Sequence, residues 1–269
     1  MVLVAGCTDL ASVADFARCG ADATGASDVF DGYVAAEANA VRLAYPPTDH
    51  PTPDEIRGRQ AAVALDRKAP ALAAGNQAAL DTLSLYLTVL GKLASDGLID
   101  VKDQANSIGA SLNALGATSA ASVVPAGNLV QFLVSAPLDA WRNRAVGNLI
   151  QGANRDVLLL CADLSTDARA VAAAWGSDIQ AARSYYARIP GPASDIRGSM
   201  LMMALANQEA TGFAANQQKA KALGAALDKV CSGQKLLYEN VDKLDLAYVT
   251  ATLNGYSAEI QNAAKVRLK

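Results

Sequence analysis

Few residues in this chain have the type and spacing that catalysis or metal binding needs. The single histidine, His50, lies in an acidic stretch with Asp49, Asp54 and Glu55. Such a group could hold a weakly bound divalent ion, although a solvated loop histidine is the simpler interpretation. One histidine excludes most zinc sites with histidine ligands and the Glu-x-x-His di-iron sites of bundles. Since the usual nucleophile, phosphate-loop and Cys-x-x-Cys motifs are missing too, we expect neither an enzyme nor a cofactor.

Two other groups have recognisable chemistry. Met200, Met202 and Met203 cluster at the start of a predicted helix, and clustered thioethers can bind Cu(I). Methionines in this position more often fill an irregular core, so we predict no metal site. Tyr185 and Tyr186 lie at the end of the preceding helix, where they form either an exposed surface for a partner or a contact with a neighbouring helix.

The amino-terminal stretch Val4-Ala5-Gly6-Cys7 resembles the lipobox of bacterial lipoproteins. In that family an aliphatic residue and two small residues precede an obligatory cysteine, so the resemblance implies cleavage before Cys7 and acylation of Cys7. Only six residues precede it, whereas a full signal has an apolar region of about 7–15 residues, so residues 1–7 represent a truncated signal. Thr8 in place of aspartate is similar to an outer-membrane sorting signal. The alternative is that Val2 to Ala5 begin a buried helix.

The amino-acid composition is that of a globular protein, and it argues against some classes of binding partner. Hydrophobic residues make up 52% of the 269 residues and charged residues 18%, as in globular proteins. The net charge of −3 and the lack of a dense basic cluster argue against nucleic acid. No apolar run approaches the roughly 18–20 residues of a membrane-spanning helix, so any membrane attachment is expected through the lipid anchor alone.

The four cysteines are Cys7, Cys19, Cys161 and Cys231. The midpoint between Cys161 and Cys231 lies close to Pro190-Gly191-Pro192, a strong break signal. Two antiparallel helices joined there would bring these cysteines to the same height. We predict a disulfide between them, worth about 4 kcal/mol for a loop of roughly 70 residues. The alternative is two buried thiols.

Apolar residues recur at helical spacing along most of the chain, and no stretch alternates as a strand would. Thr52-Pro53-Asp54-Glu55 has the composition of a helix start, and Pro137 predicts a kink within a helix that begins near Ser119. Breaks are expected near Gly25, at residues 46–53, at Pro70, Gly97 and Gly116, at Gly152 to Asn154, at residues 190–192 and at Gly233.

These patterns predict an all-α fold, an elongated up-and-down bundle of about six to seven helices. We expect residues 8–269 to form a single domain, with a possible internal boundary at residues 46–53. The hypothesis for function is a lipid-anchored periplasmic protein, at the outer membrane, that binds another envelope protein as an adaptor, assembly factor or complex subunit. The alternatives are a carrier or sensor of an apolar ligand between helices, and a cytosolic helical scaffold.

Overall fold

The computed structural model describes residues 10–25, 28–44, 52–66, 68–95, 102–115, 120–136, 142–188 and 196–267. These residues form helices and turns, without a strand among them, so the all-α prediction is confirmed. The helices are α1 (Ala11–Gly25), α2 (Val29–Ala44), α3 (Pro53–Asp66), α4 (Ala69–Ala94), α5 (Lys102–Leu115), α6 (Val123–Ser135), α7 (Arg142–Arg188), α8 (Ile196–Glu239) and α9 (Ala247–Arg267). The described residues thus hold nine helices, more than the six to seven expected.

The chain divides into two compact units. Unit 1 comprises Met1–Ser27, Gly75–Thr166 and Ala222–Lys269, and unit 2 comprises Asp28–Ala74 and Asp167–Lys221. The divisions fall within α4, α7 and α8 and between α1 and α2. The helices on either side of residues 46–53, α2 and α3, belong to the same unit.

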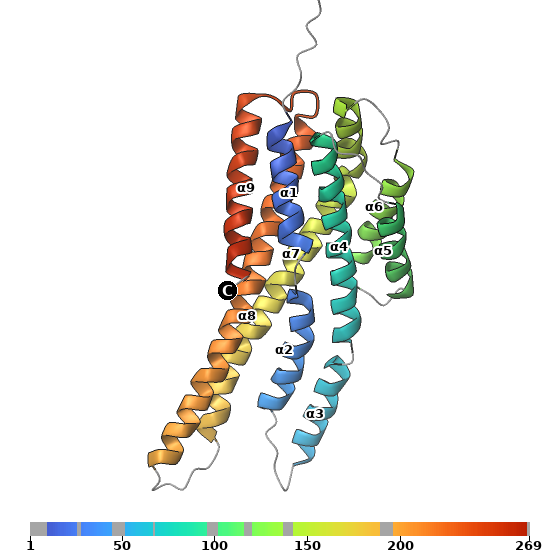
Figure 1. Cartoon of the computed structure of the whole chain (residues 1–269). Coiled ribbons are helices and arrows are strands. Elements are labelled where there is room, and N and C mark those ends of the chain that lie inside the picture. The colour runs from blue at the N-terminus through green and yellow to red at the C-terminus, as the bar shows by residue number, and fades with distance from the viewer. Residues whose placement is uncertain are drawn as a thin grey trace, which may run out of the picture. The chain divides into compact units, whose positions relative to one another are not determined.

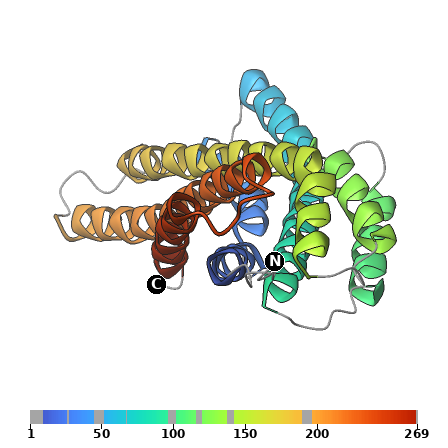
Figure 2. The ribbon, with the colours of Figure 1, turned by 90° about the horizontal axis from the view of Figure 1, so that it is seen from above.

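In unit 1, α1 packs along α9 and lies beside α4 and the second half of α8 (Figure 1). Figure 2 shows α1 nearly end-on among these helices. Phe16 of α1 is fully buried against Gly233 of α8, and Gly20 approaches Leu87 of α4. The short helices α5 and α6 form a pair of their own. Small residues therefore let α1 sit close to its neighbours.

In unit 2, α2 packs beside α3, and residues of α2 contact the second half of α7 and the first half of α8. Gly32 of α2 brings its backbone to Trp175 of α7, whose ring lies 5.3 Å from that of Phe213 of α8. At the start of α3, Thr52 N–H donates to Glu55 at 2.7 Å, and Glu55 N–H donates to the Thr52 hydroxyl at 3.3 Å. This reciprocal cap confirms the predicted helix start.

Two predicted breaks, at Gly152 to Asn154 and at Gly233, are wrong, because α7 and α8 run through them unbroken. A Cβ at Gly152 would collide with the ring of Phe132, and one at Gly233 would collide with the ring of Phe16. Each glycine therefore makes room for an aromatic ring from another helix rather than ending its own. Glycine inside a helix loses roughly 1 kcal/mol relative to alanine, and the packed ring offsets that loss.

The single helix expected from Ser119 onward, with a kink at Pro137, is divided in the structure. The helix expected from Ser119 onward is two helices, with α6 ending at Ser135 and α7 beginning at Arg142, and Pro137 lies outside the described residues. Ala136, which precedes the proline, is extended with φ −65° and ψ 133°. Residues before proline are disfavoured in helical geometry, so the helix ends there instead of bending.

The buried polar side chains fall into distinct groups. Thr24, Thr82 and Ser257 each donate a hydrogen bond to the carbonyl four residues earlier in their own helix, at 2.8–2.9 Å. Others bond across helices: the Ser122 hydroxyl to Asn76, the Ser165 hydroxyl to Asp228, and the Tyr86 hydroxyl to Gln234, at 2.6–2.7 Å. Asp178 belongs to neither group, since its Oδ2 atom has no hydrogen-bond partner.

Candidate functional site

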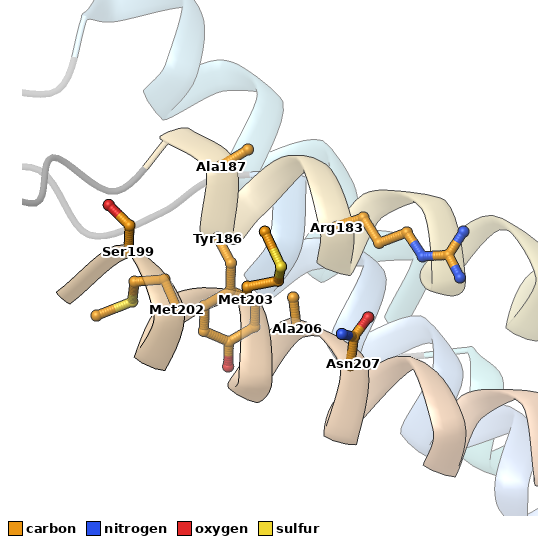
Figure 3. Close-up of a pocket in the computed structure, with 8 residues that line it drawn as sticks. All are labelled: Arg183, Tyr186, Ala187, Ser199, Met202, Met203, Ala206 and Asn207. Atoms are coloured by element: carbon orange, nitrogen blue, oxygen red, sulfur yellow. The ribbon is translucent and has the colours of Figure 1, made fainter. Parts of the chain in front are cut away.

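A pocket of about 390 Å³ lies in unit 2, between the end of α7 and the start of α8 (Figure 3). The antiparallel course of the two helices brings residues 183–187 opposite residues 199–207, at the helical spacing of one face of α8. Arg183 and Asn207 lie at one end of the pocket, and Ala187 and Ser199 lie at the other. Eight residues line it: Arg183, Tyr186, Ala187, Ser199, Met202, Met203, Ala206 and Asn207.

The predicted methionine cluster borders this pocket. Met202 is half-buried within it, whereas Met200 and Met203 are 68% and 67% exposed, and Leu201 between them is 56% exposed. The expectation that these methionines fill a core is therefore wrong for Met200 and Met203. We call the exposed side chains of Met200, Leu201 and Met203, together with the pocket, the methionine surface.

The two tyrosines of the sequence analysis occupy different positions. Tyr185 and Tyr186 are both half-buried and pack edge to face, with ring centroids 5.2 Å apart. The Arg42 guanidinium of α2 lies 6.0 Å from the Tyr185 ring centroid, so Tyr185 serves the packing of α2 on α7. Tyr186 lines the pocket and faces the methionines. Tyr186 and the methionine cluster thus line the same pocket, whereas the sequence analysis considered them as separate groups.

An acidic cluster that the sequence analysis missed lies behind Tyr186. Asp178 of α7 is only 1% exposed, and it faces Glu37 and Arg42 of α2 and Glu209 of α8. Burial is the largest cause that raises the pKa of Asp178; the charges of Glu37 and Glu209 also raise it, Arg42 lowers it, and the net result is a pKa of about 7. Arg42 forms an ion pair with Glu209. A signal was present in the sequence, because Asp178 follows Trp175 by three residues on the apolar face of its helix.

Tyr186 connects the acidic cluster to the pocket, because it lines the pocket and interacts with Glu209. Burial and the neighbouring Glu209 carboxylate raise the pKa of the Tyr186 phenol. Burial and Glu37 likewise raise the pKa of Tyr33 on α2. Both phenols therefore stay neutral and can donate hydrogen bonds to the carboxylates across the physiological range.

In the described part of the chain, no group of three or more His, Cys, Asp or Glu side chains is placed to hold a metal ion. His50 and its loop, and the lipidation candidate Cys7, lie outside the described residues. No helix within the described ranges is both long enough and apolar enough to span a bilayer.

The cysteine pair lies in the core of unit 1. Cys161 of α7 is fully buried and Cys231 of α8 is half-buried, and both are free thiols. The hydrogen bond between the two side chains and the burial of Cys161 raise the pKa of Cys161 well above its usual value. A protonated thiol is a poor nucleophile, so the raised pKa makes the Cys161 thiol less reactive at neutral pH.

We expect an oxidant such as oxidised glutathione to join Cys161 and Cys231, because the two thiols are already in contact. The reaction passes through a thiolate, so we expect it to be slow at pH 7 and faster at pH 9. Intact mass, with the loss of two hydrogen atoms, and a peptide map of the linked fragment measure it. The control is Cys231→Ser in a chain that also carries Cys7→Ser, which leaves Cys19 and Cys161. A disulfide that still forms in this variant would contradict the predicted pairing.

Comparisons with family models, with curated proteins and with solved structures find no match to this chain.

Proposed function

We propose that this chain is a lipid-anchored helical-bundle protein of the bacterial envelope that binds another protein through the methionine surface. The observation that carries the proposal is the exposure of Met200, Leu201 and Met203 beside a pocket. Contiguous exposed apolar side chains next to a hollow are typical of interaction sites. Thioethers suit such a surface because their flexible, polarizable side chains adapt to the shape of a partner.

The shape and charge of the surface favour an amphipathic helix as the partner's binding element. Met202, Met203 and Ala206 give the pocket an apolar lining, and Arg183 is the one charged residue among the described residues that line it. An apolar side chain of the partner would enter the pocket, and a carboxylate one or two turns away would pair with Arg183. Asn207 lies at the same end of the pocket as Arg183, and its amide could donate a hydrogen bond to the same carboxylate of the partner.

The envelope location rests on the resemblance of Val4-Ala5-Gly6-Cys7 to a lipobox. Acylation of Cys7 would place the bundle on a membrane surface, where a partner meets it at high local concentration.

We expect a photo-crosslinking amino acid at position 203, in the protein expressed from its native gene, to give one adduct of discrete mass in the membrane fraction. The same protein should begin at an acylated Cys7. With the partner identified and purified, the paired substitution Met200→Ser and Met203→Ser should weaken binding at least about tenfold, because each buried thioether contributes about 1–2 kcal/mol. Both side chains are exposed, so the melting temperature should stay unchanged.

The matched control places the photo-crosslinking amino acid at Gln218, an exposed position farther along the same helix. An equal yield of the same adduct from positions 203 and 218 would contradict docking on the methionine surface. A soluble product without acyl mass would contradict the anchor but leave the docking surface to be judged by the crosslinks.

A second candidate function is the binding of a small apolar ligand, and the pocket volume favours it. The 390 Å³ between α7 and α8 lies within the range of roughly 300–1,000 Å³ typical of ligand sites. Native mass spectrometry of gently purified protein separates the two functions. A bound mass of a few hundred daltons, lost on Ala206→Phe, would favour the carrier.

A further inference from the structure

Asp178 is a buried carboxylate in an environment that does not satisfy an ionised group. It is 1% exposed on α7 of unit 2, and its Oδ2 atom has no hydrogen-bond partner. The Oε2 atom of Glu209, which faces it from α8, is also buried without a hydrogen-bond partner, and the neutral phenol of Tyr186 lies next to this carboxylate. Two buried carboxylate oxygens without a donor are uncommon, because an unsatisfied charged group in a protein interior is strongly destabilising.

The charges around Asp178 do not balance. Glu37 and Arg42 face it from α2, and Glu209 faces it from α8. Arg42 is the one cation in this set, and it is already paired with Glu209. With all three carboxylates ionised, the cluster would carry a net charge of −2, and one of its charges, that of Asp178, would be almost fully buried. One bound proton would reduce the net charge to −1. On Asp178, the proton would turn the unpaired carboxylate oxygen into a hydroxyl group that can donate a hydrogen bond.

We propose that Asp178, together with Glu37 and Glu209, forms a binding site for a single proton that holds α2 against α7 and α8. At low pH the Asp178 carboxyl is neutral and the three helices pack together. When the pH rises, the carboxyl releases its proton to water, and the resulting carboxylate faces Glu37 on α2 at the helix interface. The repulsion acts between helices, so its effect is to loosen the docking of α2.

The causes of the pKa shift of Asp178 determine whether α2 loosens at high or at low pH, and over which pH range. Burial, then Glu37 and Glu209, raise the pKa of Asp178 from its ordinary value of 3.8 to about 7 in the folded state. A group whose pKa is raised on folding stabilises the fold fully below its unfolded pKa, and this contribution is lost as the pH rises through the folded pKa. The packing of α2 should therefore weaken between about pH 4 and pH 7.

The other contacts of α2 make the response graded rather than complete. Lys219 of α8 lies 3.8 Å from Asp28 at the start of α2, and Phe30 and Leu43 of α2 are fully buried. These contacts are independent of Asp178. Loosening should therefore begin on the turns of α2 that carry Glu37 and Arg42, where the charges meet.

The first test is a carbon-13 NMR titration of the side-chain carboxyl groups between pH 4 and pH 9, using the full chain. We expect one carboxyl to titrate near pH 7 and to vanish in Asp178→Asn, a variant that resembles the protonated state. Glu37→Gln should shift this midpoint to lower pH. The matched control, Asp163→Asn, changes a half-buried carboxyl on the same helix and should leave the midpoint in place.

The second test is amide hydrogen exchange of α2 at pH 5.5 and pH 8, corrected for the intrinsic exchange rate. Protection of residues 36–43 should fall at least about threefold at the higher pH in the wild type and stay constant in Asp178→Asn. An Asp178 carboxyl that titrates below pH 5 would overturn the proton site. A midpoint near pH 7 with unchanged protection of α2 would overturn its coupling to helix docking.

Discussion

Replacing Gly233 with alanine is expected to destabilise the fold by about 2–4 kcal/mol. A Cβ at this position would lie closer to Cζ and Cε2 of Phe16 than two carbon atoms approach, and 3.0 Å from Cε1. The ring of Phe16 is fully buried, so it cannot swing aside without displacing other side chains. The clash should push α1 away from α8 within unit 1. Urea unfolding monitored by circular dichroism measures the change.

Gly212 provides the matched control on the same helix. A Cβ there meets no atom within 4 Å, and the position is exposed. Gly212→Ala should therefore raise stability by up to about 1 kcal/mol, the propensity difference between the two residues. Adding Phe16→Leu to Gly233→Ala should recover part of the loss, because the smaller side chain makes room for the methyl group. Equal gains from both alanine substitutions would contradict the packing described for Gly233.

The second large effect is expected at Gln234, where replacement by methionine should cost about 2–3 kcal/mol. Its Oε1 accepts a hydrogen bond of 2.7 Å from the hydroxyl of Tyr86, a side chain with no exposed surface. Its Nε2 donates to the Ile150 carbonyl at 3.3 Å. Methionine keeps the volume but leaves the Tyr86 hydroxyl buried without an acceptor. Thermal and urea unfolding measure the loss.

A double-mutant cycle with Tyr86→Phe isolates the hydrogen bond. The single substitution Tyr86→Phe should cost about 1–2 kcal/mol, since the Gln234 amide keeps its contact with Ile150. The double variant should cost clearly less than the sum of the two, because neither polar group is then left unpaired. Strict additivity would show that the two side chains contribute independently, contrary to the geometry.

The sequence was a good guide to where helices exist and to most of their ends, but it placed two helix ends wrongly, at Gly152 and Gly233. The break near Gly25 is real, since α1 ends there and α2 begins at Val29, and Thr52 caps α3 as expected. The predictions at Gly152 and Gly233 were wrong because glycine occurs in helices for two reasons. It can end a helix, or it can leave room for an aromatic ring from a neighbouring helix. Which use applies depends on Phe132 and Phe16, which lie far away in the sequence.

The candidate site was visible only in part for a similar reason. The methionine cluster and Tyr186 stand out by residue type, but their meeting depends on how α7 and α8 align after the connection between them. Asp178 could have been noticed as a carboxylate on an apolar helix face. Its chemistry, however, depends on Glu37 and Glu209, which come from two other helices. Spacing along one helix carries no information about charges contributed by another.

The buried hydroxyls of Thr24, Thr82 and Ser257 bond to carbonyls of their own helices. Such bonds survive any sliding or rotation of one helix past its neighbour, so they contribute nothing to the choice between alternative alignments. In unit 1 that choice falls to the few bonds that cross helices, such as Tyr86 to Gln234, and to rings seated on glycine. Substitutions that remove all three hydroxyls would therefore leave the alignment of these helices unchanged. Substitutions that remove the cross-helix contacts would not.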